Sequence, residues 1–224
     1  MSGVLALVLM MPPSSGLAAR QSEGQEGFTF FEIGASTRYS ESLRAELEDR
    51  LGNDAIQRQN IIDLEVHPFK ILNTYFPKLD ELNRRLNSSL GERIEHDTLK
   101  LMYRYARNKD LPFSYVEILF SNQSELPLHI RVESRTDISA IRNTLIEKYG
   151  PSRTIEWDAA EGSTDIWRHG NDVLLFSSFP NKAGVMQFRI AIYYVDNINQ
   201  MLEREKVERK SDRQERKQAG GSAF

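Results

Sequence analysis

The spacing of apolar residues changes near residue 98, and this change constrains the fold more than any other feature of the chain. Between residues 39 and 90, apolar residues recur about every four positions, which is typical of helices with one buried stripe. From Thr98 onward, apolar and polar residues alternate, which is typical of strands that bury one face. The sequence therefore predicts an α+β protein, with helices first and a sheet after them.

Three helices are expected in a helical N-terminal region, residues 39–97. Gly52 ends the first, Asn53 or Asp54 restarts the chain into a short second helix, and Pro77 suits the first turn of the third. Gly91 then ends the third helix. The apolar positions that define the three are, in order, Tyr39, Leu43, Leu47 and Leu51; Ile56, Ile61 and Leu64; and Leu79, Leu82, Leu86 and Leu90.

Seven strands and one helix are expected in an α+β domain, residues 98–197. The helix is capped by Thr136 or Asp137 and stops at Gly150-Pro151. Short turns between neighbouring strands imply antiparallel pairing, so the sheet is largely antiparallel and this one helix covers a face of it. The strands are expected at 98–105, 113–121, 126–133, 153–157, 164–168, 172–179 and 184–194.

The C-terminal part, residues 198–224, is expected to be a charged helix followed by a disordered tail. Ile198, Met201 and Leu202 are placed to dock the start of this helix on the domain. Residues 203–217 hold seven basic and five acidic residues, a composition typical of a solvated helix or tail.

The first 19 residues are predicted to be a secretory signal peptide, followed by a linker at 20–38. Val4 to Met11 is an apolar run of signal-core length, and Leu17-Ala18-Ala19 is a plausible cleavage site. The run has no positive charge before it, so an unstructured N-terminus on a cytoplasmic protein is the alternative. No other stretch is apolar enough to cross a membrane. The predicted location is therefore periplasmic or secreted.

Composition excludes several classes of site. The chain has no cysteine, which removes disulfides, thiolate zinc sites and cysteine nucleophiles. A net charge of −3 provides no electrostatic footprint for nucleic acid. The glycine-rich and metal-binding motifs of common enzymes are also missing, so no cofactor and no metal are predicted.

Residues 113–195 resemble a module found in exported bacterial proteins of unknown function. The resemblance rests on a helix from Ile138 to Tyr149, the corner Lys148-Tyr149-Gly150-Pro151, and then Trp157 and Trp167 on successive strands. It covers a little over a third of the chain. It implies an exported α+β module and assigns no catalytic residue.

Polar clusters in loops offer two candidate sites. Glu95-His96-Asp97 could hold a tuned base or a ligand, although a turn between helix and strand is the favoured interpretation. Asp158, Glu161 and Asp165 around a glycine could hold calcium, although an acidic hairpin tip is commoner. The other histidines, His67, His129 and His169, form no local metal-binding pair.

Aromatic and basic residues on the predicted sheet provide the candidate binding residues. Trp157, Trp167, Arg168 and His169 lie close in sequence, and an aromatic ring beside a cation can stack a sugar or hold an anion; packing in the core is the alternative. A second set alternates with the core stripes and would form a mostly basic sheet face that receives an acidic segment. It contains Arg104, His129, Arg131, Glu133, Gln187 and Arg189. A solvated face, or one covered by the N-terminal helices, is the favoured interpretation.

The function predicted from these features is that of an exported, non-catalytic protein that binds another envelope protein. Its support is the leader, the well-patterned core and the lack of clustered catalytic groups. An enzyme whose site is assembled from distant residues is the first alternative, because catalytic partners meet only in the fold. A cytoplasmic regulator that binds nucleic acid through the charged tail is the second, and a net of about +2 on the tail disfavours it.

Overall fold

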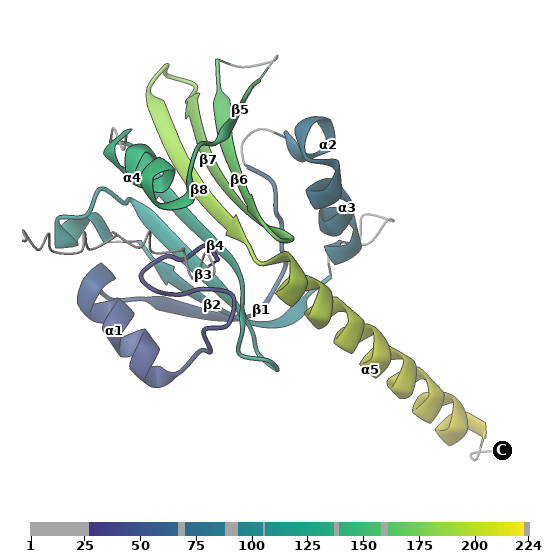
Figure 1. The fold of residues 1–224 in the computed structure, drawn as a ribbon. Helices are drawn as coiled ribbons and strands as arrows, with labels where there is room; N and C mark the ends of the chain where they lie inside the picture. Colours follow the sequence, from purple (N-terminus) through teal and green to yellow (C-terminus); the bar gives the residue numbers. More distant parts are fainter. Residues whose placement is uncertain are drawn as a thin grey trace, which may run out of the picture.

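The structure is a computed structural model that describes residues 27–66, 70–87, 94–104, 106–136, 139–157 and 161–221. Within these residues, eight strands form one antiparallel sheet in the order β1-β2-β3-β4-β8-β7-β6-β5 (Figure 1). The predicted α+β class with an antiparallel sheet is therefore confirmed. The strands are β1 (Ala55–Asn60), β2 (His96–Tyr103), β3 (Tyr115–Ser121), β4 (Pro127–Ser134), β5 (Arg153–Glu156), β6 (Ser163–His169), β7 (Asp172–Pro180) and β8 (Met186–Tyr193).

The helices begin and end at residues whose chemistry suits these places. The Ser40 hydroxyl accepts a hydrogen bond from the Leu43 N–H and caps α1, which ends at Gly52 with a positive φ of 90°. Pro77 occupies the first turn of α3. The helices are α1 (Glu41–Leu51), α2 (Leu72–Tyr75), α3 (Pro77–Leu86), α4 (Ser139–Tyr149) and α5 (Val195–Gly221), with a 3-10 turn at Ala106–Lys109.

Helices cover both faces of the sheet, and this corrects the prediction that a single helix covers it. On one face, α1 and α4 pack over a core that contains Leu101, Ile130 and Ile192. On the other, α2, α3 and the first turns of α5 pack over a second core that contains Leu175 and Tyr193. Figure 1 shows α4 and α1 on one side of the strands and α2 and α3 on the other. Because strands β3, β4, β7 and β8 bury side chains on both faces, the molecule has three layers instead of two.

The short second helix predicted from Ile56, Ile61 and Leu64 is wrong. Residues 55–60 form strand β1, which pairs with β2 at the edge of the sheet. The Ile56 side chain is 40% exposed, so it does not anchor a helix, whereas Leu64 is fully buried in the second core. The local spacing of three apolar residues is compatible with either structure, and the free hydrogen-bonding edge of β2 decides between them.

The sheet consists of two sets of four antiparallel strands, which we call meanders. Helix α1 is followed by β1–β4, in which α2 and α3 are inserted between β1 and β2, and helix α4 is followed by the uninterrupted β5–β8. The two meanders are joined by antiparallel pairing of β4 with β8, in which Ile130 lies opposite Ile192 and His129 opposite Tyr193. We call this pairing the β4–β8 seam. It makes one continuous sheet out of two halves and brings residues about 60 positions apart into register.

Replacing a core residue at the seam is expected to destabilise the whole protein. The Ile130 side chain is 1% exposed, so Ile130→Ala removes buried methylene groups and leaves a cavity, at an expected cost of about 2–4 kcal/mol in the free energy of unfolding. The same substitution at the exposed Ile56 on the edge strand is the matched control, with an expected cost below about 1 kcal/mol. Chemical denaturation followed by circular dichroism measures both. Equal losses in the two variants would contradict a core centred on the seam.

Candidate functional site

Five charged side chains cross the sheet on the face that carries the second core. Lys100 of β2, Glu117 of β3, Arg131 and Glu133 of β4, and Arg189 of β8 lie on neighbouring strands, and we call them the charged row. Their charged atoms are within ion-pair distance of one another. The N–O distances are 3.7 Å for Lys100–Glu117, 3.0 Å for Arg131–Glu117, 3.9 Å for Arg131–Glu133 and 2.7 Å for Arg189–Glu133.

The charged row is mostly enclosed, and its charges stabilise one another. The side chain of Glu117 is only 6% exposed, and it also accepts a hydrogen bond from the Tyr115 hydroxyl at 2.7 Å. Burial acts to raise the pKa of Glu117, but the neighbouring cations, led by Arg131, outweigh burial and hold this pKa below its ordinary value. Burial lowers the pKa of Arg189 against the attraction of Glu133. With three cations and two anions, the row has a net charge of only +1.

His129 lies beside the charged row and is neutral. Its ring stacks on that of Tyr193 with centroids 5.0 Å apart and an interplanar angle of 6°, and only 3% of the residue is exposed. Burial, reinforced by the positive charge of Arg131, lowers the pKa of His129 to about 3. The Tyr193 hydroxyl donates to the carbonyl of Leu64 at 2.7 Å, so the segment that follows β1 lies over this part of the face. A substrate therefore has no direct route to the imidazole.

The structure brings together part of the basic sheet face expected from the sequence. The structure places four of the predicted residues together, namely His129, Arg131, Glu133 and Arg189. Gln187 lies two residues before Arg189 on β8, where it pairs with Phe179 of β7. Arg104 does not join them, because β2 ends at Tyr103 and Arg104 is exposed in the following turn. Two members of the charged row, Lys100 and Glu117, were missed, and so was Tyr115, whose hydroxyl donates to Glu117. The alternation of β3, which is apolar at most positions on both sides, gave no signal for a carboxylate there.

The predicted aromatic and basic pair on β6 is divided between the two faces of the sheet. Trp167 is 4% exposed in the first core, and its indole N–H donates to the carbonyl of Gly150 at 2.8 Å. Arg168 and His169 are exposed at the end of β6, and Trp157 packs in the second core, stacked on Phe179. Trp167 therefore holds the corner after α4 against the sheet, and neither tryptophan ring is presented to solvent.

The acidic residues that offered a candidate calcium site do not act as one group. Asp165 lies within β6, is 5% exposed, and forms an ion pair with Arg142 of α4. It also accepts hydrogen bonds from the hydroxyls of Ser152 and Thr154 at 3.0 and 2.6 Å. These contacts hold α4 on the sheet. Asp158 lies outside the described residues, as does His67, and no cluster of three or more potential metal ligands occurs within those residues.

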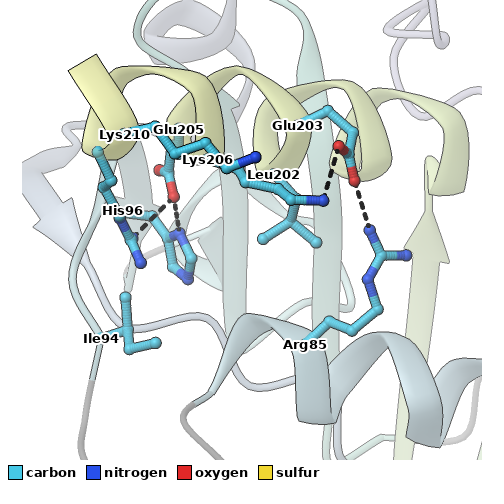
Figure 2. Close-up of a pocket in the computed structure, with 9 residues that line it drawn as sticks. Arg85, Ile94, His96, Leu202, Glu203, Glu205, Lys206 and Lys210 are labelled. Carbon is cyan, nitrogen blue, oxygen red and sulfur yellow. Dashed lines mark hydrogen bonds and ion pairs between the residues drawn. The ribbon is translucent and has the colours of Figure 1, made fainter. Parts of the chain in front are cut away.

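The second group of polar residues joins helix α5 to the body of the protein. His96, at the start of β2, is 1% exposed, and its Nδ1 lies 2.8 Å from a carboxylate oxygen of Glu205 on α5. Its Nε2 lies 2.9 Å from the carbonyl oxygen of Leu86 at the end of α3. Arg209 donates to the same oxygen of Glu205 at 3.1 Å. Figure 2 shows His96 beneath the helix, joined to Glu205 by a dashed line. We call these residues the α5 latch.

A hollow lies on each side of the α5 latch. One, of about 360 Å³, is bordered by cations, including Arg85, Lys206 and Lys210 (Figure 2). The other, of about 350 Å³, is bordered mainly by carboxylates, including Glu95, Asp97 and Glu208. The triplet Glu95-His96-Asp97 is therefore divided: the two acids border an open hollow, and the histidine between them is engaged by α5. Its partner lies 109 residues away, so the sequence carried no signal for the pair.

Comparison of the chain with protein-family models, with curated proteins and with solved structures finds no match. The resemblance of residues 113–195 to an exported module stays a prediction. Among the helices in the described ranges, none has the length and apolar character that crossing a bilayer requires. The function is therefore inferred from the geometry of the chain itself.

The buried, neutral His129 is expected to make the protein sensitive to acid. Its ordinary pKa is near 6.5, so between about pH 6.5 and pH 3 the unfolded chain takes up a proton that the folded protein does not. Stability is then lost as pH falls, by up to about 1.4 kcal/mol per pH unit from this group. His129→Phe keeps the ring stacked on Tyr193 and is expected to flatten this loss in denaturation experiments from pH 7 to 4. The control His169→Phe changes an exposed ring and should leave the slope as in the wild type; an unchanged slope in His129→Phe would refute the assignment.

Proposed function

We propose that this protein is a non-catalytic binding protein of the cell envelope, periplasmic or secreted, and that helix α5 is the arm through which it contacts a protein partner. The observation that carries the proposal is the extension of α5 well beyond the body of the protein. The helix has 27 residues, which corresponds to a length of about 40 Å. Figure 1 shows its C-terminal part leading away from the sheet.

The buried contacts of α5 are made by its first part, and beyond it Glu208 is joined to Gln123 by an exposed hydrogen bond. Ile198 and Met201 are buried in the second core, and Glu205 is held by His96. Beyond this point, residues 206–211 are exposed, and the single apolar residue among them, Val207, is 66% exposed. These turns continue an anchored helix, but residues 206–211 are exposed and gain little from apolar packing, which supplies most of the stability of helices in proteins. A partner that packs on residues 206–217 would supply the missing stabilisation, and this favours a role in binding.

The outer part of the arm, residues 206–217 of α5, has a composition that favours an acidic partner surface. Residues 206–217 contain six basic and three acidic residues, a net of +3, whereas the whole chain has a net charge of −3. The arm has no stripe of apolar residues, so a coiled-coil partner is disfavoured. A contact made by such a helix depends on charge pairs, which salt screens. An acidic segment of a partner is therefore expected to bind the arm and not the charged row, because the cations of the row are already paired with carboxylates.

Two observations support a binding role over catalysis. The carboxylates of the charged row are paired with arginine and lysine, and His129 is enclosed against Tyr193. His96 has both ring nitrogens engaged in the α5 latch. General acid–base catalysis requires a group within hydrogen-bond reach of the substrate, and these groups serve the fold instead. The signal-peptide pattern at residues 1–19 supports a place in the envelope.

Site-directed crosslinking is expected to capture the partner through the arm. A photo-crosslinking amino acid at Val207 or Ser211, introduced into the full chain in intact cells, should give a discrete adduct that mass spectrometry identifies. The same amino acid at Lys182, an exposed residue in the turn between β7 and β8, is the control and should give none of this adduct. Charge reversal of both Lys206 and Lys210 to Glu should reduce the adduct at least fivefold, and Lys182→Glu should not. Equal yields of the adduct from the arm positions and from Lys182 would contradict binding through the arm.

Export is tested separately from binding. Cleavage after Ala19 predicts that the protein recovered from cells has an intact mass lacking residues 1–19 and lies in the periplasmic fraction or the medium. Fractionation with intact-mass measurement checks both. Recovery of the full-length mass in the cytoplasmic fraction would refute export while leaving the arm unaffected.

A further inference from the structure

Cations from two helices meet at the hollow that Figure 2 shows, and we call it the basic hollow. Its volume of about 360 Å³ lies within the range of ligand sites. Leaving His96 aside, four cations and two carboxylates border it, a net charge of +2 in a chain whose net charge is −3. The cations are Arg85 of α3 and Lys206, Arg209 and Lys210 of α5, and the carboxylates are those of Glu203 and Glu205.

Glu205 is engaged within the α5 latch. Its side chain is 11% exposed, and one of its oxygens lies 2.8 Å from Nδ1 of His96. The same oxygen accepts a hydrogen bond from Arg209 at 3.1 Å. This carboxylate therefore balances Arg209 and contributes little to the other three cations of the hollow.

The three remaining cations share one carboxylate. Glu203 lies 3.5 Å from Arg85 and 3.5 Å from Lys206, and no carboxylate among the described side chains pairs with Lys210. Lys206 and Lys210 are four residues apart on α5, so their like charges lie on one side of the helix and repel one another. An anion bound between these two lysines would remove the repulsion.

The guanidinium of Arg85 is oriented before any ligand binds. Its Nη1 donates to the amide oxygen of Asn199 at 2.7 Å, and its Nη2 faces Glu203 (Figure 2). The distance of 3.5 Å from Nη2 to Glu203 is longer than the ordinary length of about 2.8 Å for a charge-assisted hydrogen bond. Nη2 therefore has hydrogen-bonding capacity left for a second carboxylate, and a donor that is already oriented binds at a lower entropic cost.

An apolar surface adjoins the cations. Ile94, two residues before β2, and Leu202 of α5 both border the hollow, and both side chains are partly exposed. Leu202 also packs against the second core, which fixes its position. An aliphatic side chain placed on Ile94 and Leu202 would remove apolar surface from water on both sides, which is favourable. The hollow thus suits a ligand that carries carboxylates next to an aliphatic group.

We propose that the basic hollow receives an acidic segment of the protein partner in which carboxylates lie next to an aliphatic residue. One carboxylate binds Nη2 of Arg85, another lies between Lys206 and Lys210, and the aliphatic side chain packs on Ile94 and Leu202. Side chains two residues apart in an extended peptide are separated by about 6.6 Å, close to the rise of about 6 Å between Lys206 and Lys210 along the helix. The inference rests on the proposed function for the existence of a partner, and it adds the place and the chemistry of the contact.

The hollow on the other side of the α5 latch directs the segment to this side. Glu95, Asp97 and Glu208 border that second hollow. Like charges placed against one another are unfavourable at an interface, so an acidic segment is repelled there. The partner is therefore expected to approach α5 from the side of α3.

Methyl NMR of the full chain tests the site without the partner. The probe is a pentapeptide of alternating glutamate and leucine with blocked ends. Its addition should shift the methyl signals of Ile94 and Leu202 and leave those of Val185, which is 52% exposed between β7 and β8, unchanged. A peptide with glutamine in place of glutamate should bind at least tenfold more weakly, and one with serine in place of leucine at least threefold more weakly.

Two neighbouring arginines of α3 provide matched variants. Arg85→Gln is expected to weaken binding of the glutamate–leucine peptide at least fivefold. Arg84→Gln should bind as the wild type does, because Arg84 pairs with Asp80 and Glu81 and does not border the hollow. Lys210→Gln, which changes an exposed side chain, should weaken binding at least threefold with the core methyl signals unchanged.

Three results would overturn the proposal: equal binding of the glutamate and glutamine peptides, equal effects of Arg85→Gln and Arg84→Gln, or unshifted signals of Ile94 and Leu202. In cells, Arg85→Gln should reduce the adduct formed from Val207 at least threefold. An undiminished adduct in this variant would refute the basic hollow and leave binding through the arm in place. Peptide binding as expected, with no adduct from the wild-type arm, would refute the proposed function and not the hollow.

Discussion

The antiparallel pairing of β4 with β8 is the contact on which the rest of the structure depends. Without the other, each meander would expose the hydrogen-bonding edge of β4 or of β8 and much apolar surface. Pairing at the seam covers the β4 edge of the first meander and the β8 edge of the second. It also places Ile130 beside Ile192 under α4. The same pairing places Glu133 beside Arg189 on the opposite face, so the hydrophobic core and the charged row have one common origin.

The two faces of the sheet bury different kinds of side chain. Under α1 and α4, the strands present a mainly apolar surface, with the Asp165–Arg142 ion pair between β6 and α4 as a buried polar contact. On the other face, α2, α3 and the base of α5 cover mainly the second meander, and the charged row occupies the strands near the seam and β2. Buried charges are costly unless they are paired, and the alternation of cations and anions along the row satisfies this condition. A surface that appears basic from the positions of its arginines is thus close to neutral.

Helix α5 combines a fixed base with an arm that has little intrinsic support. The base is held by apolar packing, which depends only weakly on pH, and the next turn is held by a histidine and a carboxylate. This arrangement explains how a charged helix can be both part of the fold and available to a partner.

Much of the fold was readable from local pattern, because side-chain period is a local property of the backbone. The alternation in residues 98–194 predicted the strands and the face of each residue, so His129, Arg131 and Arg189 were correctly placed together. The stop at Gly150-Pro151 predicted the end of α4. Even on the charged row, however, the partners Lys100 and Glu117 were missed, since β3 is apolar on both sides and shows no polar face.

What the tertiary structure alone decided is which distant segments meet. Residues 55–60 became a strand because β2 offers an edge, the sheet acquired its order because β4 and β8 pair, and His96 met Glu205 across 109 residues. Such contacts depend on the free energy of the assembled chain, in which the entropy of closing long loops is offset by burial and hydrogen bonding. The local sequence determines whether a segment has the periodicity of a helix or of a strand. The packing of the whole chain determines which other segments it contacts.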